Sequence, residues 1–297
     1  MKRMRSLLLV GLCLLSTLAG AFAQEILLGT TSGAAGSLYS INPTTGAATS
    51  IGFLQDGIGD PFGVTGLAWD SLTGVLYGST SNNSGTTPGA LVTIDPNTGT
   101  VTLVGAFATS GPLFTMSDLT FDATTGNLYG VSALTGDLYT VNMLTGLAVP
   151  VGNAGFLPLS TTGNGLAASS GGTLFGTPTG ANGTLFTYSK SNGAVTTVAT
   201  LSGAPIPAGS INALAFNGAG TLFGVNIDSG QGASKNTHLI TINTTTGAIT
   251  DVGASVNSLD AIVFISPIPE PTTTALLGAG MVFLTLIGLR RYRRSVS

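Results

Sequence analysis

Short segments in which apolar and polar residues alternate recur along the middle of the chain. Two of them, residues 38–41 and 91–94, are each followed by a turn that starts with Asn or Asp and ends in Thr-Gly. Strict alternation over a few residues predicts a strand with one buried face. Asn or Asp starts a turn by bonding its own backbone, and glycine adopts the positive φ that leads into the next strand. The pattern therefore predicts β-hairpins.

Two patterns recur along the chain, each with a spacing of about 50 residues. Hairpin copies end at Gly46, Gly99, Gly146, Gly193 and Gly247, and an apolar pair closed by glycine ends at Gly29, Gly78, Gly130, Gly176 and Gly224. Each unit holds four short strands, which is typical of a β-propeller blade. A solenoid coil, with a period of about 20 to 30 residues, is the weaker alternative.

The ends of the repeat region favour a closed ring. The first unit lacks its opening strand, and a spare strand follows the fifth hairpin at residues 258–264. Pairing of these two ends would complete one blade and leave no open sheet edge. We therefore expect residues 24–266 to form an all-β propeller of five four-stranded blades, closed by its N- and C-terminal strands. The spacers near 79–89 and 227–236 are expected to be longer surface loops.

Composition agrees with a β-rich fold. Hydrophobic residues make up 43% of the 297 residues, charged residues 7%, and glycine accounts for 44 positions. A disordered chain is excluded because disorder requires low hydrophobicity and high net charge. Collagen is excluded because no Gly-x-y period is present. A helical bundle is disfavoured because Glu, Lys, Arg and Gln are scarce.

The N-terminus has the three parts of a secretory signal peptide. Lys2, Arg3 and Arg5 precede an apolar run over residues 7–19, and Ala21 and Ala23 provide a small-x-small cleavage site. Residues 1–23 are therefore predicted to be a signal helix that signal peptidase removes, the alternative being a buried N-terminal helix. The single cysteine of the chain lies in this segment, so the mature chain has no disulfide and no cysteine metal site.

The C-terminus, residues 267–297, combines a proline-rich motif, an apolar stretch over 275–289 and a basic cluster. These features predict a single transmembrane helix whose basic end stays in the cytoplasm. The residues concerned are Pro269, Glu270, Pro271, Arg290, Arg291, Arg293 and Arg294.

This tail resembles the PEP-CTERM sorting signal that exosortases read in Gram-negative bacteria. The resemblance covers about a tenth of the chain, and it departs from the usual pattern by a threonine triplet after the motif and by Tyr292 inside the basic cluster. It implies a precursor anchored in the inner membrane, cleavage near the motif, and delivery to the cell surface or to an exopolysaccharide matrix. The alternative is a single-span anchor without processing.

Charge excludes one class of partner. Between residues 24 and 267 the cations are Lys190 and Lys235, against eleven acidic residues, for a net charge of −9. Nucleic-acid binding requires basic groups that face phosphates, so it is not expected.

The sequence contains no recognisable catalytic or cofactor motif. His238 is the only histidine, so a Ser-His-Asp triad would have to use it, and a solvated or packed role is the simpler interpretation. No histidine cluster suits zinc, and no glycine-rich loop continues into the Lys and Ser/Thr of a phosphate-binding loop. The turns after Asp70 and Asp122 lack the acidic ladder of a calcium loop, which favours a structural role. We expect no cofactor.

One set of polar residues stands near the start of the opening strands, which a propeller directs at its central channel. Asp118 and Asp260 are interpreted as equivalent positions, and the full set is Thr65, Asp118, Asn164, Asn212 and Asp260. Such a ring could bind a sugar or a cation, and two suitably spaced carboxylates could hydrolyse a glycosidic bond. The alternative is that these residues are polar strand starts that face solvent.

Three functions from different classes follow. The first is a non-enzymatic surface or matrix protein that presents its propeller as an interaction or structural module, and that meets signal peptidase and exosortase during processing. The second is a carbohydrate-binding module, with the cell's own exopolysaccharide as a partner beside other surface proteins. It would require exposed aromatic rings, whereas Tyr77, Tyr129, Phe175 and Phe223 occupy core-like strand positions. The third is a glycosidase or lyase.

Overall fold

The computed structural model describes residues 25–108, 114–152, 165–178, 183–203, 211–227 and 237–266. The predicted signal segment 1–23, the sorting tail 267–297 and Asn164 lie outside these residues. One compact unit runs from Glu25 to Ile265. In the part of the chain that the structure describes, no helix is long and apolar enough to cross a membrane.

The described chain forms twenty β-strands. In chain order they are β1 (Ile26–Thr31), β2 (Ser37–Ile41), β3 (Ala48–Phe53), β4 (Val64–Asp70), β5 (Val75–Thr80), β6 (Ala90–Ile94), β7 (Val101–Ala106), β8 (Met116–Asp122), β9 (Asn127–Ser132), β10 (Leu138–Val141), β11 (Ala148–Gly152), β12 (Leu166–Ala168), β13 (Leu174–Gly176), β14 (Thr184–Tyr188), β15 (Val195–Thr200), β16 (Ile211–Phe216), β17 (Leu222–Ile227), β18 (Thr237–Ile242), β19 (Ile249–Ala254) and β20 (Leu259–Ile265).

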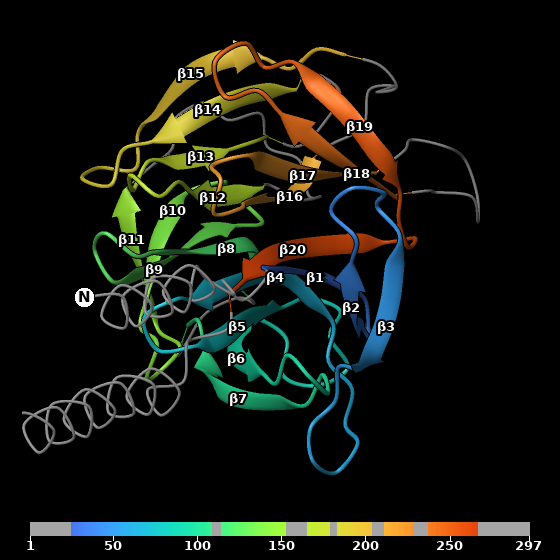
Figure 1. Ribbon diagram of the computed structural model, residues 1–297. Coiled ribbons are helices and arrows are strands. Elements are labelled where there is room, and N and C mark those ends of the chain that lie inside the picture. Colours follow the sequence, from blue (N-terminus) through green and yellow to red (C-terminus); the bar gives the residue numbers. More distant parts are fainter. Residues whose placement is uncertain are drawn as a thin grey trace, which may run out of the picture. The chain divides into compact units, whose positions relative to one another are not determined.

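These strands pair into five four-stranded antiparallel sheets, so the predicted all-β propeller of five blades is confirmed. We number the blades by chain order. Blade 1 is β20-β1-β2-β3, blade 2 is β4 to β7, blade 3 is β8 to β11, blade 4 is β12 to β15 and blade 5 is β16 to β19. Figure 1 shows β3, β7, β11, β15 and β19 at the periphery, with the first strand of each sheet near the middle.

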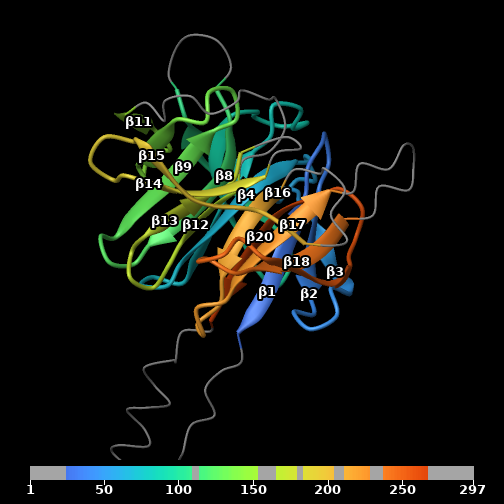
Figure 2. The same cartoon turned by 90° about the horizontal axis from the view of Figure 1, so that it is seen from above.

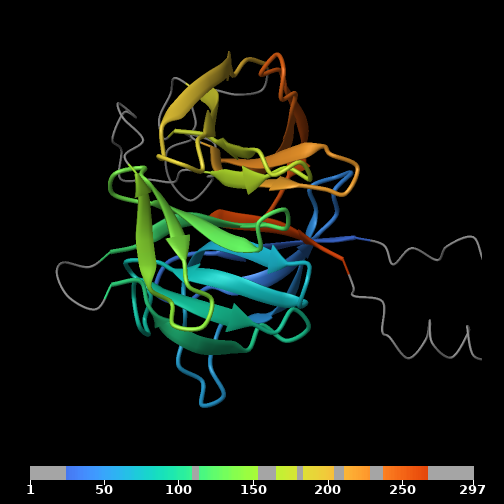
Figure 3. The same cartoon turned by 90° about the vertical axis from the view of Figure 1, so that its left-hand side faces the viewer.

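Blade 1 combines strands from both ends of the domain. β20 pairs with β1 from Ile26↔Ile265 to Thr31↔Leu259, and the ladder is interrupted by one register shift between Thr30 and Thr31. Figure 2 shows the blue β1 beside the orange β20. In the side view, the red β20 crosses the domain between the yellow and orange sheets and the green and blue ones (Figure 3). The inner strands β20, β4, β8, β12 and β16 each contact the next around a ring.

The hairpin turns have the geometry that the repeat predicts. The closing glycines Gly46, Gly99, Gly146, Gly193 and Gly247 all have φ between 70° and 80°. This left-handed region is open to glycine and costly for other residues. In the first of these turns, Asn42 Oδ1 accepts a hydrogen bond from Thr44 N at 2.9 Å. The turn chemistry inferred from the sequence therefore explains where each outer strand begins.

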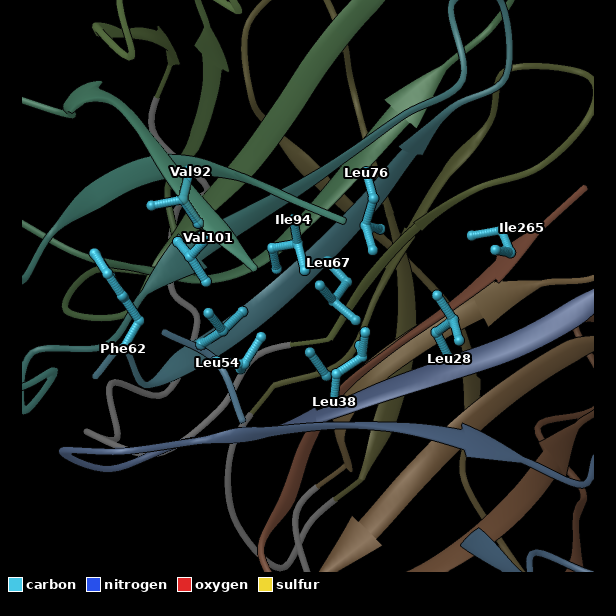
Figure 4. Close-up of a cluster of buried hydrophobic side chains, with 12 residues drawn as sticks. Leu28, Leu38, Leu54, Phe62, Leu67, Leu76, Val92, Ile94, Val101 and Ile265 are labelled. Atoms are coloured by element: carbon cyan, nitrogen blue, oxygen red, sulfur yellow. The ribbon is translucent and has the colours of Figure 1, made fainter. Parts of the chain in front are cut away.

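The hydrophobic core lies between neighbouring blades. One cluster joins Leu28 and Leu38 of blade 1 to Leu67 and Leu76 of blade 2, and all four are at most 2% exposed (Figure 4). Four further clusters of the same kind fill the rest of the domain. Burial of a leucine side chain contributes about 1.5–3 kcal/mol, so the contact between blades is the main source of stability.

The outer rim joins each blade to the previous one through backbone. A Cβ on the closing turn glycine of each blade would meet backbone atoms near the end of the previous blade's outer strand. The contacts are Gly46 with Gly253, Gly99 with Phe53, Gly146 with Gly105, Gly193 with Gly152, and Gly247 with Thr200. Hydrogen bonds reinforce this rim, among them Val101 N to Gln55 O at 2.8 Å. The outer strands therefore follow one another head to tail around the rim.

Candidate functional site

The polar residues near the starts of the inner strands occupy β-bulges. In β4, β8, β16 and β20 the register shifts by one residue, because one extra residue of each strand is inserted between two pairs of the ladder. These residues are Thr65, Ser117, Asn212 and Asp260, which we call the bulge ring. Bulges often redirect a side chain at the rim of a barrel. The bulge ring is therefore the place where the inner strands present polar groups.

The interpretation of Asp118 as the equivalent of Asp260 is wrong by one residue. The repeated glycine of each blade, Gly130 in blade 3 and Gly29 in blade 1, gives a common reference point for the two strands. Leu119 of β8 pairs with Gly130, and Ile262 of β20 pairs with Gly29. Counting back two residues gives Ser117 and Asp260. Asp118 therefore belongs to the next position, which Gly66, Gly165, Ala213 and Ala261 fill in the other blades. Because Ser117 and Asp118 are adjacent polar residues on β8, the sequence alone does not show which of them corresponds to Asp260.

Asp118 binds the inner strands of four blades. Its Oδ1 accepts a hydrogen bond from its neighbour Leu119 N at 2.9 Å, and its Oδ2 accepts one from Leu166 N at 2.8 Å and one from Leu214 N at 3.3 Å. The backbone N–H of Leu67 is a fourth donor. These donors lie on β8, β12, β16 and β4. The carboxyl therefore ties the strands together at the axis.

Burial dominates the acid–base behaviour of Asp118. The residue is 0% exposed, and this burial raises the pKa of its carboxyl well above the usual range. The hydrogen bonds from Leu166, Leu119, Leu214 and Leu67 lower the pKa but do not outweigh burial. A carboxyl that is both buried and bonded to backbone cannot touch a substrate. Asp118 and Asp260 therefore do not form the pair of solvent-facing carboxylates that glycoside hydrolysis requires.

Asp260 and Asn212 form a hydrogen-bonded polar pair in the bulge ring, in which Asn212 is buried and Asp260 is half-buried. Asn212 Nδ2 donates a hydrogen bond to Asp260 Oδ1 at 3.2 Å, across the boundary between blades 5 and 1. Partial burial raises the pKa of Asp260 to about 6, against the lowering effect of the hydrogen bonds from Asn212 and from the backbone of Ser32. Asp260 is half-buried and is therefore the more exposed member of the pair.

The other two members of the bulge ring bond to backbone. Thr65 Oγ1 donates to Met116 O at 2.9 Å, which links blade 2 to blade 3. Ser117 Oγ donates to Val131 O at 3.3 Å within blade 3. Thr65 is half-buried and Ser117 is buried. The groups that can contact a ligand at this end are therefore Asp260 and Thr65.

A second set of hydroxyls was not anticipated from the sequence. The residue after the repeated glycine donates to the next inner strand in three blades. These bonds run from Thr30 Oγ1 to Val64 O at 3.3 Å, from Ser79 Oγ to Met116 O at 3.4 Å, and from Thr177 Oγ1 to Ile211 O at 3.1 Å. Valine stands at the equivalent positions 131 and 225. The sequence signal was a hydroxyl directly after the glycine in three of five units.

His238 forms a hydrogen bond with an acidic residue. It lies on β18, and its Nδ1 is 3.0 Å from Asp251 Oδ1 of β19. Both side chains are about a quarter exposed. The histidine thus stands on the outer half of blade 5, away from the inner strand on which the bulge ring residue of that blade lies.

The acidic turns hold their own backbone. Both carboxylate oxygens of Asp122 accept hydrogen bonds, from Thr124 Oγ1 at 2.7 Å and from Lys190 Nζ at 2.8 Å. Asp70 Oδ1 accepts one from Leu72 N at 2.9 Å. These bonds agree with a structural role for the turns. Among the described residues, no group of three or more His, Cys, Asp or Glu side chains could hold a metal ion.

Comparisons with known proteins identify the fold. No family model and no curated protein matches the chain. The crystal structure of a nidogen/laminin complex contains a chain similar to 81% of this one over 98% of its own length, with a TM-score of 0.51 and 13% sequence identity. A structural genomics protein of unknown function from Bacteroides thetaiotaomicron matches 67% of this chain over 53% of its own, with a TM-score of 0.47 and 19% identity. At this identity the first similarity shows the propeller fold alone.

Proposed function

We propose that this chain is an exported, non-enzymatic protein of the cell surface or extracellular matrix, sorted by exosortase, which presents its propeller as an interaction or structural module. A propeller module fits a protein-interaction or structural role. The observation that carries the proposal is the order of the parts: a signal-like segment, a five-bladed propeller, and a tail with the Pro-Glu-Pro motif, apolar stretch and arginine cluster.

The two ends of the propeller domain lie side by side in blade 1, which suits a domain with a processing segment at each end. Ile26 pairs with Ile265, so the two predicted processing segments join the domain at the same end of one sheet. Asp260 stands at the other end of β20. A propeller held by its tail therefore keeps the bulge ring at the end of the strand that is remote from the attachment point.

Carbohydrate binding is the second candidate function. The observation that favours it is the half-buried Asp260, whose carboxylate is held by the buried Asn212 and can accept hydrogen bonds from sugar hydroxyls. A glycosidase is not carried forward, because the second carboxyl that it would need is the buried Asp118.

Intact mass and cell fractionation test the main proposal. The protein would be isolated from its own host with and without exosortase. We expect a product that starts at Gln24, ends near Pro269 and accumulates outside the cell only when exosortase is present. A full-length tail that stays in the inner membrane in both strains would contradict the proposal and reduce the tail to a simple anchor.

Binding to the host's purified exopolysaccharide tests the second candidate. Asp260→Asn keeps the size of the side chain and removes its charge, and Asp95→Asn is a matched change in an exposed turn of blade 2. Weaker binding in the first variant alone would support carbohydrate recognition at the bulge ring. Equal binding by both variants would place recognition elsewhere.

A further inference from the structure

One outer hairpin of the propeller differs from the other four. In the hairpin formed by β10 and β11, three apolar side chains are exposed: Leu144 at 88%, Val149 at 59% and Leu147 at 38%. Val149 lies on β11, and Leu147 comes directly before the first residue of this strand. Leu144 belongs to the turn that leads into this strand. We call these three residues the blade 3 patch.

The other blades provide an internal comparison. Register alignment places Val149 at the position of Thr49, Thr102, Thr196 and Thr250. Spacing from the turn glycine places Leu144 at the position of Thr44, Asn97, Ser191 and Thr245, and Leu147 at the position of Ala47, Thr100, Ala194 and Ala248. All of these counterparts are exposed. The fold therefore accepts small or polar residues here, and blade stability does not explain the larger apolar residues of blade 3.

Exposed apolar residues that gather on one element mark an interaction surface. We propose that the blade 3 patch is a self-association surface through which two copies of this chain form a weak symmetric dimer. A two-fold axis at the patch places the same apolar residues opposite each other, so the surface is complementary to itself.

Charge favours a second copy as the occupant. The propeller region has a net charge of −9, so most of its faces repel another copy. Residues 138–152, the whole β10–β11 hairpin, contain no Asp, Glu, Lys, Arg or His. The hairpins of blades 2, 4 and 5 contain Asp95, Lys190 and Asp251 respectively. The blade 1 hairpin is also uncharged, but it has threonine at two of the three positions. The blade 1 hairpin also exposes Phe53 at the end of β3, but among the uncharged outer hairpins only that of blade 3 has apolar residues at all three of these positions.

The edge strand limits the kind of contact. β11 lies at the periphery of its sheet (Figure 1), and its exposed Pro150 has no N–H to donate to an added strand. Proline on an edge strand disfavours strand addition, which would otherwise lead to open assemblies. Association through side chains is the remaining mode. A standard interface buries roughly 800 Å² on each partner. The three side chains of the blade 3 patch bury less than this on each copy, so the dimer should be weak.

The test is sedimentation velocity over a wide concentration range, on the protein purified in the form in which it accumulates in cells. The variant Leu144→Thr/Leu147→Ala/Val149→Thr replaces each residue by one that another blade carries, so the fold should be kept. The matched control is Leu134→Thr, which changes a 67% exposed leucine in the β9–β10 connection of the same blade. Thermal unfolding checks that all three proteins are equally folded.

We expect reversible dimerisation of the unchanged protein and of the control, and a dissociation constant raised by about tenfold or more in the triple variant. A monomeric unchanged protein, or a triple variant that dimerises as well as the control, would overturn the proposal. Binding of the monomer to uncharged phosphatidylcholine vesicles through the same three residues would also overturn it, because the surface would then belong to a membrane contact.

Discussion

The axis and the outer rim of the propeller join the blades in different ways. At the axis, one carboxyl from blade 3 accepts hydrogen bonds from four inner strands. At the rim, each blade repeats a backbone contact centred on a turn glycine. The rim joint occurs five times, whereas the joint at Asp118 occurs once, beside hydroxyl bonds that link neighbouring inner strands in three blades. The difference teaches that a regular repeat can support its rim evenly and its axis by side chains that vary from blade to blade.

Asp118→Ala should have the largest effect, because it leaves the backbone N–H groups of four strands without their shared acceptor. We expect a loss of about 4 kcal/mol of unfolding free energy, measured by urea denaturation. The control Ser117→Ala changes the neighbouring residue, which bonds Val131 O within its own blade. It should lose about 1 kcal/mol. Equal losses would show that Asp118 has no special role at the axis.

Gly146→Ala should have the second largest effect on stability, because it disrupts the backbone contact between Gly146 and Gly105 at the rim. The added Cβ would overlap the backbone of Gly105, and φ is +78°. We expect a loss of about 3 kcal/mol. Gly126→Ala is the matched change, since Gly126 has φ +71° but no atom within 4 Å of the added Cβ. It should cost about 1 kcal/mol. If the two variants unfold at the same denaturant concentration, the rim contact contributes nothing.

Lys190→Met tests a link between the last residue of β8 in blade 3 and the turn after β14 in blade 4. Burial alone would raise the pKa of Asp122, but the hydrogen bonds from Lys190, Thr124 and Thr125 lower it below the ordinary 3.8. The pair therefore stabilises the fold above this pH and loses its effect as the pH falls through the folded pKa. We expect the variant to be about 1–2 kcal/mol less stable at pH 7 and equal to the unchanged protein at about pH 2. A difference that is independent of pH would contradict the ion pair.

Asp260→Asn should act through the pH dependence of stability, and it separates the bulge ring from the axis. Because the folded pKa of about 6 exceeds the unfolded value of 3.8, the unfolded state ionises first as the pH rises. The stability that Asp260 contributes is present below 3.8 and is lost as the pH rises to about 6. The variant should remove this slope in unfolding curves measured from pH 3 to 7. A slope that persists unchanged would belong to Asp118 or another group.

Local patterns explain why the fold could be predicted from the sequence. The positive φ of the turn glycines and the alternation of the strands depend on a few neighbouring residues, and both repeat five times. The rim partner of Gly146 could also have been found, because a Val-Gly or Ile-Gly pair recurs at Gly52, Gly105, Gly152 and Gly253. This pattern acquires a structural meaning only when the preceding blade lies beside the turn.

The candidate site was harder to predict because it depends on a one-residue shift. A bulge moves the polar position of β8 to Ser117 and sends Asp118 toward strands from three other blades. Neither the bulge nor these partners has a signature near Asp118 in the sequence. Asn212 and Asp260 were placed correctly relative to each other because their two strands have the same shift. Their hydrogen bond joins residues 48 positions apart and required the assembled ring.

The pairing of β20 with β1 has a consequence for how the chain folds during its synthesis. β1 emerges first, but its neighbour on one side, β20, is the last strand of the domain to be made. Contacts between residues so distant in sequence are slow to form, because closing a long loop costs chain entropy. Until then blade 1 has an open edge, which invites pairing with other chains. Chaperones that bind the newly made chain should therefore protect β1 for longer than any other strand.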